Sequence, residues 1–139
     1  MFAGNSVFLA TGAINGTGGL RFPHVITNEG NDYNPSTGEY TCRILGTYWF
    51  SVALGKGQGT PEHVQCWILV NGDIKIWIAF GVNYTGNTSS VNTVSGSGGF
   101  HLYTGDRVHV GSCIGYIHDY SETHFSGVLV RPDAWIYYM

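Results

Sequence analysis

The chain has 139 residues, the length of one compact domain that can bury about two thirds of its unfolded surface. Charged residues make up 11% of it, against roughly 25% in an average soluble domain, and neither the six Lys and Arg nor the nine Asp and Glu form a cluster. This excludes a nucleic-acid binder with a basic stripe, and 43% hydrophobic residues exclude a charge-rich disordered chain. No apolar run approaches the ~18 residues of a membrane span, so we expect no membrane insertion.

Short runs of alternating, β-branched and aromatic residues recur along the chain between Gly, Asn and Pro, which is typical of strands joined by turns. In chain order the predicted strands are Ser6–Ala10, Leu20–Thr27, Gly38–Leu45, Thr47–Leu54, Glu62–Val70, Ile74–Val82, Thr88–Ser95, Gly98–Tyr103, Arg107–Gly115 and His124–Arg131. No window of about a dozen residues has apolar residues at helical spacing without a Gly that interrupts the pattern. The sequence therefore predicts a single all-β domain of ten strands, a sandwich or a barrel.

Two of these strands carry additional signals. Asn71-Gly72 stands between apolar runs and predicts a type I′ hairpin, because both central residues of that turn need positive φ. The strand from Val64 to Val70, which contains Trp67, is apolar on both faces. A strand of this kind is covered on its second face either by another subunit, which we favour, or by long loops.

Aromatic, Asn and Gly residues between Phe22 and Val52 have a characteristic spacing. They are Phe22, Asn28, Tyr33, Gly46, Tyr48 and Phe50, with Tyr40 and Val52 where Phe and an aromatic residue are usual. Further on stand Gly105-Asp106-x-Val108-x-Val110 and Phe125-Ser126-Gly127-x-Leu129. In these three motifs, in this order, the chain resembles the globular-head domain of complement C1q, within the tumour-necrosis-factor-like jelly-roll superfamily. The resemblance runs from about Val7 to Arg131.

The alternation of side chains along a strand agrees with these motif residues. Tyr48, Phe50 and Val52 alternate and point to one face, while Trp49 and Ser51 point to the other. We expect a core and subunit scaffold made of Phe22, Tyr33, Tyr48, Phe50, Trp67 and Phe125. Gly127 would allow the last strand to approach this set closely.

The resemblance implies a ten-stranded C1q/TNF-like jelly roll that assembles as a homotrimer, with the first, last and central strands facing the axis. The doubly apolar strand around Trp67 fits that expectation. The family is largely extracellular, works by recognition of microbial surfaces, glycans or protein partners, and is not an enzyme family.

No catalytic motif contradicts this implication: the chain has no nucleophile elbow, no zinc-protease motif, no phosphate loop and no dinucleotide-binding glycine pattern. Gly55-Lys56-Gly57-Gln58-Gly59 lacks the Ser or Thr and the helix that a phosphate loop requires. We therefore predict that the protein is not an enzyme.

We expect no resident metal or cofactor, with calcium as the open alternative, since several members of the resembled family bind it through acidic loops. Between Asp73 and Asp106 this chain has no Asp or Glu, whereas calcium sites need carboxylates. Residues 28–39 are polar like a calcium loop, but Tyr33 stands where the sharp turn needs Gly. His118, Asp119, Glu122 and His124 are the candidates for a transition metal, and their alternative interpretation is a solvated loop. For His101 and His109, in mid-strand, we expect local partners.

Surplus aromatics mark the expected ligand site, since sugar rings stack on aromatic faces while polar side chains bind hydroxyls. The candidate ligand-binding residues are Tyr84, Asn87, Arg107, Tyr116, His118, Asp119 and Tyr120. The alternative is that these aromatics pack under loops or in a subunit interface.

The sequence also bears on the oxidation state of the cysteines and on the compartment of the protein. Cys42, Cys66 and Cys113 allow one disulfide with one free thiol, or three thiols. The N-terminus has no basic region and predicts no signal peptide within this chain, while Asn15, Asn83 and Asn87 lie in glycosylation sequons compatible with secretion. The apolar tail Pro132–Met139 is expected to cover a neighbouring subunit or a sheet edge.

These observations predict a secreted, C1q-like, lectin-like recognition module of innate immunity, with a domain core at about residues 7–131 and a C-terminal extension, 132–139. Its expected partners are copies of itself and glycans or microbial polysaccharides, and trimer avidity would strengthen weak single sites. The competing hypothesis is a cytokine-like or matrix head that binds a protein receptor.

Overall fold

The computed structural model describes residues 4–16, 19–56, 64–80, 92–114, 117–118 and 123–133. These residues form β1 (Val7–Thr11), β2 (Ile14–Gly16), β3 (Gly19–Arg21), β4 (His24–Glu29), β5 (Tyr33–Asn34), β6 (Glu39–Thr41), β7 (Gly46–Lys56), β8 (Val64–Val70), β9 (Asp73–Phe80), β10 (Asn92–Leu102), β11 (Arg107–Ile114), β12 (Ile117–His118) and β13 (His124–Pro132). The predicted all-β jelly-roll class is confirmed.

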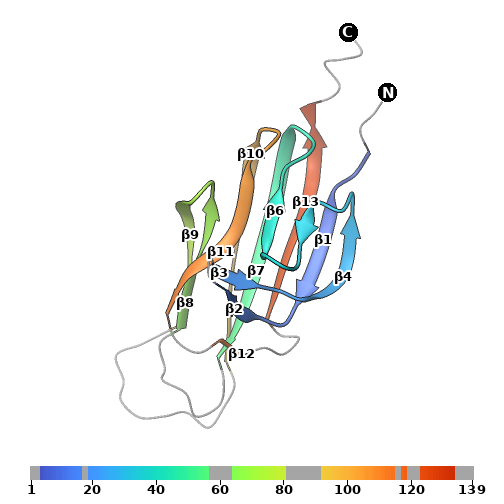
Figure 1. Ribbon diagram of the computed structural model, residues 1–139. Helices are drawn as coiled ribbons and strands as arrows, with labels where there is room; N and C mark the ends of the chain where they lie inside the picture. Colours follow the sequence, from blue (N-terminus) through green and yellow to red (C-terminus); the bar gives the residue numbers. More distant parts are fainter. Residues whose placement is uncertain are drawn as a thin grey trace, which may run out of the picture.

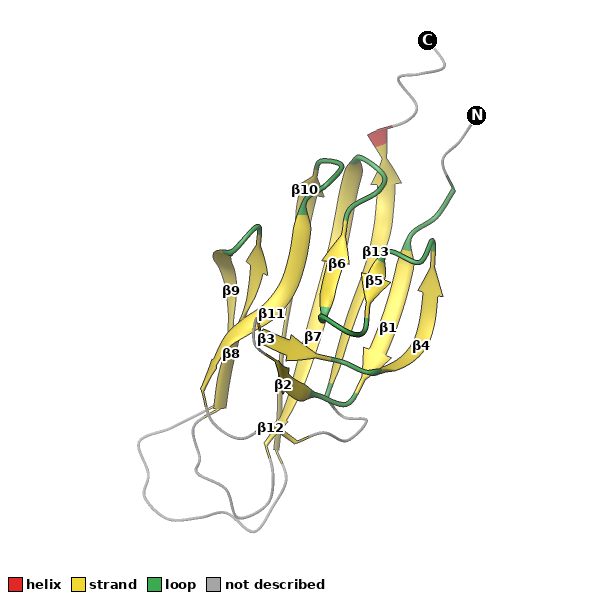
Figure 2. Cartoon of the chain, viewed as in Figure 1, coloured by secondary structure: helices red, strands yellow, loops and turns green. Residues whose placement is uncertain are grey.

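The strands form two main sheets that face each other (Figures 1 and 2). The six-stranded sheet has the order β10-β7-β13-β1-β4, with β12 paired to one end of β7, and the five-stranded sheet has the order β5-β6-β11-β8-β9. The strands β2 and β3 form a small third sheet. Every strand pair is antiparallel, and neighbours such as β1 and β13 come from opposite ends of the chain.

Alternation along the strands builds the core between the sheets. On β7, Tyr48, Phe50 and Val52 are fully buried, while Trp49 points away and is half-exposed. On β1, Phe8 and Ala10 are the buried residues of the same pattern. Because side chains of a strand have a period of two, β1 and β7 bury one face and leave the other for solvent or a partner.

An aromatic cluster joins the two sheets. The ring of Phe8 on β1 stacks on Tyr33 at a centroid distance of 4.7 Å, lies 5.3 Å from Tyr40, and meets Phe125 edge-on at 4.9 Å. Tyr33 and Tyr40 belong to the five-stranded sheet, whereas Phe8 and Phe125 belong to the six-stranded sheet. Such offset-stacked and edge-to-face pairs add to the stabilisation from burial. The expected scaffold residues Phe22, Tyr33, Tyr48, Phe50 and Phe125 are all buried.

The predicted hairpin is present. Asn71 and Gly72 connect β8 to β9, and their φ angles are 52° and 84°. Both residues therefore have the left-handed conformation that a type I′ turn requires.

Three parts of the strand prediction differ from the structure by more than one or two end residues, and the short strands β2, β5 and β12 were not predicted. The predicted strand Leu20–Thr27 is divided into β3 and β4 at Phe22-Pro23, because Pro offers no N–H to a sheet. Only Glu39–Thr41 of the predicted Gly38–Leu45 is a strand, β6. The predicted strands Thr88–Ser95 and Gly98–Tyr103 are joined in one continuous strand, β10, within the described part of the chain.

The strand around Trp67 does not support the expectation that the first, last and central strands face a trimer axis, because it is not in the same sheet as those strands. This strand, β8, belongs to the five-stranded sheet, whereas β1, β13 and β7 are adjacent in the six-stranded sheet. Trp67 is half-buried, outside the core cluster, and points away from the sandwich. Apolar character on both faces of a strand does not reveal to which sheet the strand belongs.

Candidate functional site

The outward face of the six-stranded sheet carries an apolar row across three adjacent strands. Val7 of β1 pairs with Val128 of β13, and Val128 pairs with Trp49 of β7. Trp49 is 48% exposed and Val128 is 37% exposed. These large apolar side chains are in register and only partly buried within the single chain, so they suit a contact with another molecule.

A shallow hollow of about 330 Å³ lies beside this row. Its lining includes Val7, Leu9, Thr27, Trp49, Ser126 and Val128. The lining thus combines apolar side chains with two hydroxyl groups and the His124 imidazole and has no carboxylate, which suits a largely apolar partner surface.

The outward face of the five-stranded sheet carries a second aromatic feature. Trp67 of β8 and Trp77 of β9 stand opposite each other, and their rings stack with a centroid distance of 6.1 Å and an interplanar angle of 26°. The indole Nε1–H of Trp77 donates a hydrogen bond to Oε1 of Gln65 at 3.2 Å. Trp77 is nevertheless 57% exposed.

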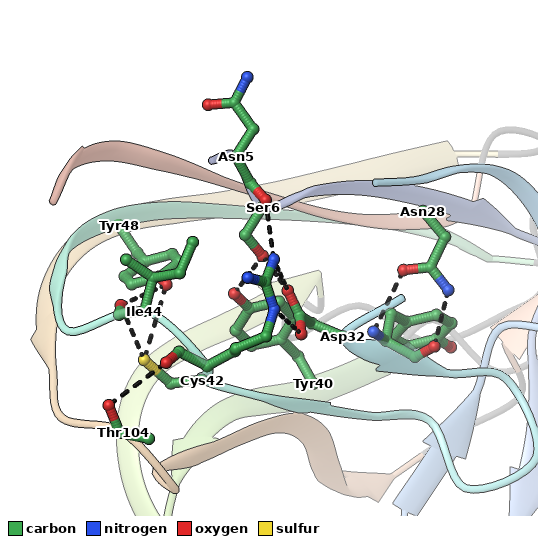
Figure 3. Close-up of polar contacts among 11 residues, drawn as sticks. Asn5, Ser6, Asn28, Asp32, Tyr40, Cys42, Ile44, Tyr48 and Thr104 are labelled. Atoms are coloured by element: carbon green, nitrogen blue, oxygen red, sulfur yellow. Dashed lines mark hydrogen bonds and ion pairs between the residues drawn. The ribbon is translucent and has the colours of Figure 1, made fainter. Parts of the chain in front are cut away.

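A polar cluster at one end of the sandwich holds the start of β1 against the loops around β5 and β6 (Figure 3). The carboxylate of Asp32, whose side chain is 7% exposed, accepts hydrogen bonds from the Ser6 hydroxyl at 2.7 Å and from the Arg43 guanidinium at 3.0 and 3.2 Å. Arg43 also donates to the Asn5 carbonyl oxygen at 2.9 Å, and the Ser6 and Tyr40 hydroxyls are 2.6 Å apart. The partners of this carboxylate are structural, so we assign the cluster to fold stability.

Burial accounts for the tyrosine pKa values in this region. Removal of the phenol from water raises the pKa of Tyr33 and of Tyr40 to about 12, although hydrogen bonds to Phe22 and Ser6 respectively oppose the shift. Burial also raises the pKa of Tyr48, whose hydroxyl donates to the Ile44 carbonyl oxygen at 2.6 Å. These phenols stay neutral and serve as hydrogen-bonding parts of the core.

The structure resolves the two cysteine alternatives. Cys66 of β8 and Cys113 of β11 form a disulfide, and Cys42 is a free, buried thiol. Burial raises the pKa of the Cys42 thiol, which lies 3.2 Å from the Ile44 carbonyl oxygen and 3.6 Å from the Tyr48 hydroxyl. A buried neutral thiol of this kind is not a nucleophile.

The predicted ligand residues are only partly within the described chain. Arg107 at the start of β11 is exposed, its guanidinium lies 4.0 Å from the Glu39 carboxylate, and its backbone N–H donates to Asn71. His118 lies in β12, which pairs with Gly55 of β7, and its side chain lies outside the described part. Tyr84, Asn87, Tyr116, Asp119 and Tyr120 lie outside the described residues. No contact among these seven residues is therefore established, and they stay candidates.

Metal sites find no support in the described residues, among which no group of three or more His, Cys, Asp or Glu side chains gathers. Of the transition-metal candidates, Asp119 and Glu122 lie outside the described residues. In the polar stretch 28–39, Asn28 bonds the backbone of Tyr33 and Asp32 is paired with Arg43, so their oxygens already have protein partners.

The two mid-strand histidines differ. Nε2 of His101 lies 2.9 Å from the Asp133 carboxylate. Nδ1 of His109 is buried and has no hydrogen-bond partner among the described residues, so the expectation of a local partner is wrong for this ring nitrogen.

No described helix is long and apolar enough to cross a membrane.

Comparison with known proteins decides the family. Residues 6–130 match the model of the C1q domain. The chain belongs to the C1q domain family. C1q- and TNF-like family members are non-enzymatic modules, so the prediction that this protein is not an enzyme is confirmed.

The related proteins include both complement and tumour-necrosis-factor-related members. The chain is 26% identical over 120 residues to mouse complement C1q tumor necrosis factor-related protein 2, a match that covers 82% of this chain and 38% of that protein. It is 50% identical over 32 residues to a human complement C1q subcomponent, covering 23% of this chain and 13% of that protein. The chain thus spans well under two thirds of the length of these relatives.

Solved structures agree on the fold. The globular domain of zebrafish complement 1qA is similar with a TM-score of 0.68 at 16% identity, covering 94% of this chain and all of the other. The Eiger TNF of S. frugiperda is similar with a TM-score of 0.69 at 13% identity, covering 92% and 94%. At these identities the similarity establishes the fold alone.

Neither Trp77 nor the apolar row of Val7, Trp49 and Val128 was predicted from the sequence as a surface feature. For Trp49 the signal was present, since it alternates with core residues on β7. For Trp77 the sequence carried no such signal, because only the register shift between Ile68 and Leu69 brings it opposite Trp67.

Proposed function

We propose that this protein is a secreted recognition head that assembles as a homotrimer and binds glycans on microbial surfaces. The observation that carries the recognition function is the C1q domain match over residues 6–130. The low content of charged residues, 11%, favours neutral ligands over phosphates or acidic polymers.

The proposed subunit contact is the outward face of β1, β13 and β7. It contains the apolar row of Val7, Val128 and Trp49 and the hollow beside it. Burial of these side chains against a second copy would contribute roughly 25 cal/mol for each Å² of apolar surface removed from water. Three copies would present three identical ligand sites, so that weak single sites bind a repetitive surface with avidity.

Secretion is supported by the Cys66–Cys113 disulfide, since structural disulfides persist in oxidising compartments. The sequons at Asn15, Asn83 and Asn87 are compatible with it. The candidate ligand residues remain Tyr84, Asn87, Arg107, Tyr116, His118, Asp119 and Tyr120.

The test is a glycan array with the purified, folded protein, once with calcium and once with a chelator. We expect binding to a related set of sugars in both buffers. Loss of binding on chelation would overturn the expectation that no metal takes part. A silent array in both buffers would overturn the glycan function.

The second candidate is a head that binds a protein receptor. It is favoured by the similarity to complement C1q tumor necrosis factor-related protein 2. Under this alternative the array stays silent, and the apolar surfaces would contact a protein.

A further inference from the structure

The geometry of the tryptophan pair on the five-stranded sheet restricts what it can bind. Because Trp77 donates its Nε1–H to Gln65, the polar edge of this indole already has a partner. The ring stack with Trp67 further restrains its orientation. What remains available on the exposed Trp77 is a π face, which attracts either cations or the C–H face of a ring.

The charges around the pair select between these two ligand types. The strand register places His109, Leu69 and Ile74 in one neighbouring row, and Ile114, Gln65 and Ala79 in the other. None of these residues carries a carboxylate. Lys75, the extra residue of β9 at the register shift two positions before Trp77, is exposed and adds a positive charge nearby. A cationic ligand would find no counter-charge in these rows, whereas a neutral ring with hydroxyl groups needs none.

The accessible part of the pair is mainly the ring of Trp77, since Trp77 is 57% exposed and Trp67 is half-buried. Gly111 stands opposite Trp67 on β11 and is itself buried, with Gly19 of β3 packed against it, and Ala79 follows Trp77 on the same face of β9. Ile74 and Ile114 border the pair and are about as exposed as Trp77, at 54% and 55%. The result is an aromatic surface, exposed mainly at Trp77, with an apolar border and the ammonium group of Lys75 nearby.

We propose that Trp67 and Trp77 form a stacking platform for a pyranose ring of a neutral glycan, with the ammonium group of Lys75 donating to a ring hydroxyl. This inference rests on the proposed glycan-binding function and names a site for it outside the loop residues. The platform lies on the opposite side of the sandwich from the proposed subunit contact, so each subunit of a trimer would present it outward.

The test combines binding and assembly measurements on the full chain. Immobilised β-glucan, galactan, mannan and chitin oligosaccharides are the probes for the wild type and for the Trp77→Ala and Trp77→Phe variants. The matched control is Tyr103→Ala, which removes another exposed aromatic at the β10–β11 turn. NMR spectra of the indole Nε1–H groups report directly whether the ligand contacts the pair.

We expect Trp77→Ala to weaken binding at least about ten-fold, with Trp77→Phe intermediate and Tyr103→Ala unchanged. The indole signals of Trp67 and Trp77 should shift on addition of the bound oligosaccharide. Full affinity in Trp77→Ala, with wild-type binding intact, overturns the platform and leaves the glycan function standing. No binding to any probe by the folded wild type overturns both. A changed molecular mass of Trp77→Ala identifies the pair as a subunit contact and also overturns the platform.

Discussion

At the residue scale, the buried phenols make stability depend on alkaline pH. The folded-state pKa of Tyr33 and Tyr40 is about 12, above the ordinary value of 10, because burial disfavours the phenolate. The stabilisation is therefore fully present below pH 10 and is lost as the pH rises from about 10 to about 12.

We predict that the free energy of unfolding, measured by urea titration, falls by at least about 2 kcal/mol between about pH 8 and about pH 11. The variant Tyr40→Phe should show a smaller fall, since it has one buried phenol fewer. Equal stability at both pH values would contradict the role assigned to these tyrosines.

The cysteines give a second prediction at this scale. The buried Cys42 thiol, with its raised pKa, should not react with iodoacetamide in the native protein, whereas the urea-unfolded, unreduced chain should take up one equivalent. Intact-protein mass spectrometry counts the adducts. Labelling of the native protein, or three adducts without a reductant, would show that the thiol is accessible or that Cys66 and Cys113 are not joined.

At the scale of elements, packing of β13 against the core depends on Gly127. A Cβ atom there would lie 2.5 Å from Cε1 of Phe50 and 2.6 Å from Cε1 of Phe8, both rings of the aromatic core. We predict that Gly127→Ala lowers the free energy of unfolding by about 2–3 kcal/mol, because the core has no space to relax.

The matched control is Gly99→Ala on β10, where the added Cβ would make only ordinary contacts, with Trp49 at 3.5 Å. Urea denaturation of both variants checks the prediction. A Gly127→Ala variant as stable as Gly99→Ala would mean that the close approach of β13 is not required.

Structural features that are set by residues close together in the sequence could be predicted from it. The hairpin at Asn71-Gly72 and the alternation of Tyr48, Phe50 and Trp49 follow from turn chemistry and period two. Prediction failed for features that are set by contacts with residues distant in the sequence. The Gly- and Ser-rich middle of β10 suggested a turn, yet Gly96 and Gly98 lie in a continuous strand, with Ile78 and Ile76 of β9 packed over them.

The pairing of Trp67 with Trp77 could not be predicted from the sequence either. An unbroken two-residue hairpin would place Trp67 opposite Ile76, but a bulge between Ile68 and Leu69 shifts the register and brings Trp67 opposite Trp77. A bulge of this kind leaves no signal in the sequence. The predicted loop residues were chosen by composition, and only the exposed Arg107 has a described side chain.

At the scale of the whole molecule, the two outward faces have different proposed tasks. The face of β1, β13 and β7 would join subunits, and the face of β8 and β9 would meet the ligand. The same substitution on the two faces separates these tasks, because Trp49 and Trp77 are similarly exposed, at 48% and 57%. We predict that Trp49→Glu dissociates the assembly and that Trp77→Glu leaves it intact, since only the first charge would be buried at the subunit contact.

Sedimentation equilibrium of the wild-type chain tests assembly through this apolar face more directly than any other measurement. We expect a mass about three times the 15.1 kDa of the chain, which falls in Trp49→Glu and persists in Trp77→Glu. A wild-type mass of 15.1 kDa at every concentration, from protein shown to be folded, would contradict the proposed assembly.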